Sequence, residues 1–177
     1  GPGTLILSST VTLSNGMEIG EDPGGNARTY GGTVVLRGQG TLLNGNVTIG
    51  HGGVFQIDNS VGNLRHRLGD TAQIDLFGGT LALVSGSGVQ SEESLGLVRG
   101  RNTYTGTVQV LTSPIAGSNA TWRFTSFGLE GTNQSSSVKF VGRGQNISNT
   151  GTSRVAFNVL PGGPTALQDG ILPQTVI

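Results

Sequence analysis

Apolar and polar residues alternate in short runs along the first 111 residues, and glycine or asparagine interrupts each run. An alternation with a period of two predicts β-strands, because successive side chains of a strand point to opposite faces. Asn15-Gly16 and Asn44-Gly45 predict tight turns, since both residue types accept positive φ. Helical spacing is scarce, and only residues 91–97 could begin a short helical turn. The pattern therefore predicts an almost entirely β protein.

The alternating region also repeats itself. Residues 15–20 resemble residues 44–50, and a Gly-Thr start followed by Leu or Val recurs at positions 3, 32, 40, 79 and 106. Repeats built from short strands predict a β-solenoid, in which each rung stacks on the next. With roughly 20–30 residues per rung, residues 4–111 would form four or five rungs. A β-sandwich remains the alternative, because its strands recur every 8–12 residues as well.

Two segments interrupt this pattern. The polar, Gly- and Pro-rich stretch near residues 21–31 predicts a loop inserted between rungs of a first unit, residues 1–111. Five of the nine aromatic residues lie between Trp122 and Phe157. A solenoid needs a cover over its open end, so we expect residues 112–177 to form a β-rich C-terminal cap packed on the solenoid. The apolar tail, residues 171–177, would be a final strand or a segment that awaits a partner.

Composition narrows the possible functions. The chain has 177 residues with 32 glycines, no cysteine and a formal net charge of zero. The neutral charge removes the main driving force for nucleic-acid binding, so we expect no nucleic-acid partner. No apolar run reaches about 18 residues, which predicts no membrane-spanning helix. No signal peptide is visible. Gly1-Pro2 is compatible with a protease scar and with a native start.

A polysaccharide-degrading solenoid would need acidic side chains on neighbouring rungs next to a base. Asp58 and Asp75, with Arg65 and Arg67, are the candidates for such a site. The alternative is that these residues are solvated on the outer face. The basic triplet at 65–67 and the Arg99-Gly100-Arg101 triplet could contact an acidic glycan, or could pair with Asp70 and Glu92.

Three further possibilities concern ligands. Trp122 could stack on a sugar, but its alternation with Phe124 favours a place in the core. The two histidines lack the spacing of a zinc site, and no cysteine is present, so we predict no metal and no cofactor. No catalytic triad signature with a partnered histidine occurs, and we predict no enzyme activity.

Three stretches, at residues 67–83, 91–97 and 102–108, resemble the autotransporter-associated β-strand repeat proteins. The run Asn-Thr-Tyr-Thr-Gly-Thr-Val at 102–108 resembles the core of that repeat. Residues 67–83, in which Arg-Leu-Gly-Asp precedes an alternating strand and Gly-Gly-Thr-Leu, and residues 91–97 resemble its flanking parts. The resemblance implies a right-handed parallel β-helix, as in passengers of secreted or surface bacterial proteins. It brings no catalytic residues, and only one clear copy of the repeat is present here.

Three functions follow as expectations. The first is a non-catalytic structural or adhesive module, secreted or at a bacterial cell surface. The second is a carbohydrate-binding or polysaccharide-degrading β-helix protein. The third is a homo-oligomer or filament, in which uncovered strand edges of one copy pair with the next copy.

Overall fold

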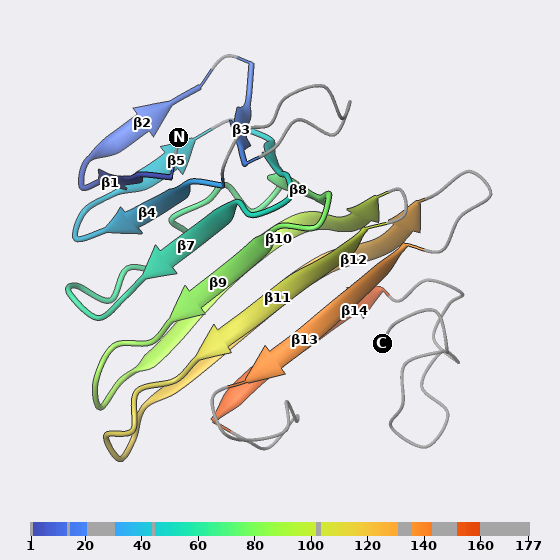
Figure 1. Cartoon of the computed structure of the whole chain (residues 1–177). Helices are drawn as coiled ribbons and strands as arrows, with labels where there is room; N and C mark the ends of the chain where they lie inside the picture. Colours follow the sequence, from blue (N-terminus) through green and yellow to red (C-terminus); the bar gives the residue numbers. More distant parts are fainter. Residues whose placement is uncertain are drawn as a thin grey trace, which may run out of the picture.

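The fold is a parallel β-solenoid, as the computed structural model of the chain shows (Figure 1). The structure describes residues 2–13, 15–20, 31–43, 45–101, 104–130, 136–142 and 152–159, which contain no helix. Sheet A has the strand order β1-β4-β7-β9-β11-β13, sheet C the order β14-β12-β10-β8-β6-β3, and sheet B pairs β2 with β5. The strands are β1 (Thr4–Leu7), β2 (Thr10–Thr12), β3 (Met17–Ile19), β4 (Thr33–Arg37), β5 (Thr41–Leu43), β6 (Val47–Ile49), β7 (Val54–Asp58), β8 (Gln73–Leu76), β9 (Thr80–Val84), β10 (Gln90–Arg101), β11 (Thr105–Leu111), β12 (Asn119–Glu130), β13 (Ser137–Gly142) and β14 (Ser153–Val159).

Every described strand pairing is parallel, which confirms the solenoid and excludes the β-sandwich alternative. The first two rungs are β1-β2-β3 and β4-β5-β6. The next two are β7 with β8 and β9 with β10, and β11 begins a fifth. The expected four or five rungs over residues 4–111 are therefore present.

Apolar side chains form columns that run through the interior from rung to rung. In sheet A, the register places Leu5 beside Val34, Val34 beside Phe55, and Phe55 beside Leu81. Except for Leu5 at the end of the stack, these residues belong to the buried core. Because alternate residues of each strand point inward, the period of two in the sequence becomes this stack of equivalent positions.

The rung changes shape between β7 and β8. Sheet B ends after β5, and its only continuation among the described residues is a single bridge between Leu42 and Leu68. From the next rung on, each rung has one strand of sheet A and one long strand of sheet C, which are β9 with β10 and then β11 with β12 (Figure 1). Residues 59–72 therefore lie where a three-strand rung gives way to a two-strand rung.

The suggested helical turn at residues 91–97 is wrong, because these residues belong to β10. Ser91, Glu93 and Leu95 are buried at alternate positions, and each has a partner on β12. The adjacent glutamates and leucines gave this stretch a helical composition, but its pairing with β12 decided its structure.

Both sheets continue beyond residue 111 without a break. β12 pairs with β10, β13 with β11 and β14 with β12, so the described residues after 111 are further rungs, not a separate layer. They carry an aromatic cluster, in which Phe157 lies 5.6 Å from Phe124 and 5.7 Å from Phe140 between ring centroids. Residues 21–30 of the loop expected near 21–31, and the apolar tail at 171–177, lie outside the described residues. In the part of the chain that the structure describes, no helix could cross a membrane.

Candidate functional site

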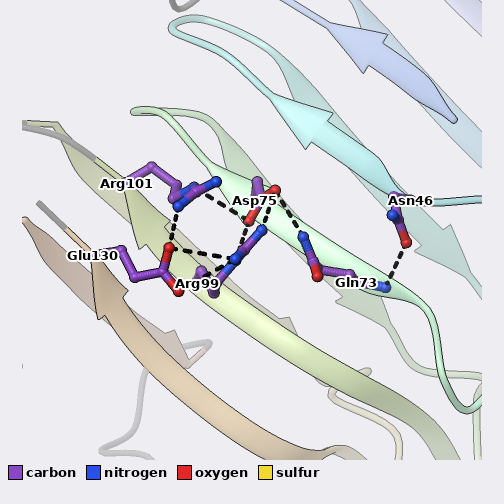
Figure 2. A network of polar contacts seen from close by, with 6 residues as sticks. All are labelled: Asn46, Gln73, Asp75, Arg99, Arg101 and Glu130. Atoms are coloured by element: carbon purple, nitrogen blue, oxygen red, sulfur yellow. Dashed lines mark hydrogen bonds and ion pairs between the residues drawn. The ribbon is translucent and has the colours of Figure 1, made fainter.

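Four charged side chains form a network on the outer face of sheet C (Figure 2). Asp75 lies on β8, Arg99 and Arg101 on β10, and Glu130 on β12, so three successive rungs contribute. Arg99 and Arg101 point to the same face because they are two residues apart on one strand. The sequence folds this way locally because Ile74, Leu76 and Val98 alternate with them and fill the interior.

Arg99 is the centre of this network. Its Nε lies 2.6 Å from Asp75 Oδ1 and its Nη2 lies 2.9 Å from Asp75 Oδ2, a bidentate pair. Its Nη1 donates to Glu130 Oε1 at 3.2 Å on the other side. Arg101 contacts both carboxylates as well, with its Nε 3.6 Å from Asp75 Oδ1 and its Nη1 hydrogen-bonded to Glu130. The network thus bridges three rungs.

Neighbouring groups extend the network at both ends. Gln73 Nε2 donates to Asp75 Oδ2 at 3.0 Å, and the backbone N–H of Gln73 donates to Asn46 Oδ1 at 3.4 Å (Figure 2). The guanidinium carbon of Arg101 lies 5.8 Å from the centre of the Phe77 ring. Beside Asn46 is a hollow of about 220 Å³ lined by Gly45, Asn46, Gly69, Thr71 and Ala72. Its lining carries no charged side chain that could fix a ligand.

The charges of the network are arranged to hold neighbouring strands together. Two carboxylates face two guanidinium groups, so their formal charges cancel. The hydrogen bond and charge of Asp75, assisted by Glu130, raise the pKa of Arg99. A second pair, Arg123 Nε with Glu92 Oε1 at 2.9 Å, joins β12 to β10. Within the described ranges, no group of three His, Cys, Asp or Glu residues could hold a metal ion.

A second polar cluster is buried at the corner where the rung changes shape. Arg67 is fully buried, and its guanidinium donates to Asn59 Oδ1 at 2.7 Å, to Gly40 O at 2.8 Å and to Gly62 O at 2.7 Å. Burial lowers the pKa of Arg67, and the charges of Glu93 and Asp58 oppose this shift. A guanidinium carries five donors in a rigid fork, which suits it to bind several acceptors at once.

Glu93 completes the buried cluster. Its side chain is also fully buried, and its two oxygens accept the backbone N–H groups of Arg67 at 3.0 Å and of Leu68 at 2.8 Å. Burial raises the pKa of Glu93 to about 7, although these hydrogen bonds and the charges of His66 and Arg67 act in the opposite direction. The cluster binds backbone N–H and C=O groups, and its two charged side chains are buried.

The four candidate residues of a polysaccharide-degrading site, Asp58, Asp75, Arg65 and Arg67, lie in different parts of the solenoid. Asp58 ends β7 on sheet A, where it pairs with Arg37 Nε at 3.3 Å and accepts the N–H of Ser60 at 2.9 Å. Asp75 lies on sheet C, and Arg67 is inside the solenoid. Arg65 is exposed between β7 and β8. The four residues therefore occupy two sheets, the interior and a connecting segment, and form no common groove.

Trp122 lies in the core and not on the surface. Its ring is fully buried, its Nε1–H donates to Gln109 O at 3.2 Å, and its ring centroid is 6.0 Å from that of Phe124. A buried indole whose N–H already has an acceptor cannot stack on a sugar. Of the two interpretations of Trp122, the structure agrees with the core role.

The basic triplets at 65–67 and 99–101 were expected to contact an acidic glycan, to be solvated, or to pair with Asp70 and Glu92. His66 of the first triplet does lie beside Asp70, with Nδ1 2.7 Å from Oδ1. Glu92 pairs with Arg123 instead, and Arg99 and Arg101 pair with Asp75 and Glu130. The alternating Arg-x-Arg on a strand was a signal for a shared face. Its partners Asp75 and Glu130 follow only from the register, which places Arg99 beside Asp75 and Arg101 beside Glu130.

Comparison of the chain with protein-family models, with curated proteins and with solved structures found no match.

Proposed function

We propose that this chain is a non-catalytic structural or adhesive module of a secreted or surface-exposed bacterial protein. The observation that carries this proposal is a set of ion pairs on sheet C. They join Asp75, Arg99, Arg101 and Glu130 across three rungs. These side chains tie the solenoid together and leave no unpaired acid and base facing each other. The resemblance of residues 67–83, 91–97 and 102–108 to autotransporter-associated repeats supports the same class.

The polysaccharide-degrading alternative makes an opposite prediction for the same residues. We expect no release of reducing ends or unsaturated products from uronic-acid and neutral polysaccharides, with wild-type protein or with Asp75→Asn. Turnover by the wild-type chain that is lost in Asp75→Asn or Asp58→Asn would overturn the structural proposal. Retention of the protein on an immobilised glycan without turnover would support an adhesive role for the proposed module.

Assembly into a filament is a second candidate, which the first rung favours. β1 is the end strand of sheet A, and Leu5 and Ile6 on it are each 52% exposed. Parallel strands stacked by translation leave edges that can pair with a second copy head to tail, without closure. We expect the molar mass from light scattering to rise with concentration and to fall to 18.1 kDa in Leu5→Lys.

Val61 provides a matched control for this experiment, because it is also 52% exposed but lies in the connection after β7. Val61→Lys should assemble like the wild-type chain. A constant 18.1 kDa for the wild-type chain at all concentrations would exclude assembly and leave the structural module as a single unit.

A further inference from the structure

Sheet A has an open edge at each end in the described part of the chain (Figure 1). β1 is its first strand and pairs only with β4, and β13 is its last strand and pairs only with β11. The pairings between them are all parallel and in register, so each position of β1 begins a column that runs through every rung to β13. The two ends can therefore be compared position by position.

The columns of sheet A have apolar side chains at both ends. The inward column that begins at Leu5 ends at Phe140, and the outward column that begins at Ile6 ends at Val141. Leu5 and Ile6 are each 52% exposed, and Phe140 is only partly buried against the core. These end positions are therefore less covered than the middle of the same columns, and another rung would cover them.

The backbone groups on the two open edges are complementary. At four pairings along sheet A, an N–H in the column of Thr4 donates at 2.9 Å to the carbonyl oxygen one position earlier in the preceding rung; these bonds run from Thr33 to Gly3, from Val54 to Gly32, from Thr80 to Gly53 and from Thr107 to Gly79. Alternate residues of a parallel strand bond to opposite neighbours. The N–H and C=O groups of Thr4 and Ile6 therefore face the open edge of β1.

The same alternation applies to β13. The N–H of Ser137 donates to Tyr104 O at 3.4 Å, so the groups of Ser137, and of every second residue after it, face β11. The N–H and C=O groups of Val138 and Phe140 are left on the open edge. This edge thus presents its donors and acceptors in the columns where β1 needs them.

Sheet C offers no second pair of matching edges. Its first strand, β3, lies in the columns that reach Phe127 and Leu129 on β12. Its last strand, β14, pairs with residues 120–126 of β12. The two end strands of sheet C therefore occupy different positions along the rung. A junction through sheet A alone would be a ladder of the four residues of β1, and so small an interface predicts association only at high protein concentration.

We propose that a second copy of the chain adds its β1 to β13 of the first copy, parallel and in the register that places Ile6 beside Val141. This inference rests on the assembly candidate described above and specifies its direction, which is head to tail along sheet A. In this register the N–H of Thr4 donates to Val138 O and the N–H of Ile6 donates to Phe140 O. The junction then repeats the pairing that joins the rungs within one chain.

Replacing Ile6 by proline tests the backbone pairing. Ile6→Pro removes an N–H that faces the open edge and is not used in the pairing with β4, and an edge strand tolerates proline at such a position. In light scattering, we expect Ile6→Pro to stay at 18.1 kDa at concentrations where the wild-type mass grows. Ile6→Val, which keeps the N–H and a branched apolar side chain, is the matched control and should assemble. Equal assembly of the two variants would overturn the pairing.

Disulfide cross-linking tests the register, and it applies even if Ile6→Pro does not fold. The chain has no cysteine of its own. In the double variant Ile6→Cys, Val141→Cys, the proposed junction places the two Cα atoms about 4.8 Å apart, within the range for a disulfide. Oxidation under assembly conditions should give covalent oligomers, and mass spectrometry should find peptides that link positions 6 and 141. The double variant Ile6→Cys, Lys139→Cys is shifted by two positions and should give at least tenfold fewer links between copies.

The outcomes distinguish this inference from the assembly on which it rests. A wild-type mass that stays at 18.1 kDa at every concentration would exclude assembly and this junction with it. Growing mass with links only between two copies of position 6 would keep assembly but overturn the head-to-tail direction. Growing mass with equal linking at positions 139 and 141 would keep assembly but overturn the register.

Discussion

Two arginines that lie two positions apart have opposite fates in this chain. Arg65 is exposed, whereas Arg67 is completely buried and binds three oxygens, one from Gly40 and two from the segment that contains Asn59 and Gly62. No sequence pattern separates them, because charged residues are rarely buried and both read as surface residues. Arg67 is buried because its guanidinium donates to the carbonyl groups of Gly40 and Gly62, which lie at the corner outside the paired strands. The interior position of an arginine therefore followed from the fold and not from its neighbours in sequence.

Replacing Arg67 should destabilise the protein far more than replacing Arg65. In Arg67→Met, the carbonyl oxygens of Gly40 and Gly62 lose a buried donor, and Glu93 loses a compensating charge. We expect the free energy of unfolding to fall by roughly 3 kcal/mol. Arg65→Met should change it by less than about 0.5 kcal/mol. Urea unfolding followed by circular dichroism measures both, and equal effects would contradict the structural role of Arg67.

At the scale of strands, the alternation of apolar and polar residues was sufficient to predict β structure, and the Gly-Thr repeats predicted the stacking. The sequence failed at residues 91–97, where β10 carries a buried glutamate at an inward position. It also could not place the long charged residues, because their partners come from other rungs at register positions that no local pattern contains. Thus the elements were predictable, and the contacts between rungs were not.

The ion pair between Asp75 and Arg99 should couple the rungs more strongly than that between Glu92 and Arg123. The first pair is bidentate with side chains only 13% and 16% exposed, whereas the second is 31% and 49% exposed. Double-mutant cycles to alanine should give a coupling energy of roughly 1–2 kcal/mol for the first pair and under about 0.5 kcal/mol for the second. Added salt should weaken the second pair more, since solvent screens exposed charges. Equal coupling energies would argue against the network as a link between rungs.

Close approach of successive rungs requires glycine at Gly40. A Cβ atom there would lie 1.9 Å from the carbonyl oxygen of Leu7 in the preceding rung, with no space to move because that oxygen belongs to the backbone. Gly40→Ala should therefore separate two rungs and destabilise the protein by more than about 2 kcal/mol. Gly69, around which a Cβ would meet nothing within 4 Å, is the control. Gly69→Ala should be neutral or slightly stabilising in thermal unfolding, because alanine restricts the unfolded chain.

The described part of the molecule is a stack in which each strand pairs only with strands of the adjacent rungs. Stability in such a stack is close to a sum of rung and interface contributions, so a rung with one neighbour is less stable than a rung with two. Rung β1-β2-β3 is at the end of the described stack, and Leu5 and Ile6 on it are exposed where their equivalents Val34 and Val35 are buried. The same end would carry any contact with a second copy.

Amide hydrogen exchange should therefore follow the order of the rungs. Below the concentration at which light scattering detects assembly, we expect β1 and β3 to exchange at least tenfold faster than β8 and β9, which have a paired strand on each side. Leu5→Lys should accelerate exchange only in the first rung, because its interior column is already open there. Leu81→Ala removes a fully buried side chain from β9 and should accelerate exchange in the central rungs as well. If the first rung proved as protected as the centre in dilute solution, the end would not be open, and both the graded stability and the end-to-end assembly would have to be abandoned.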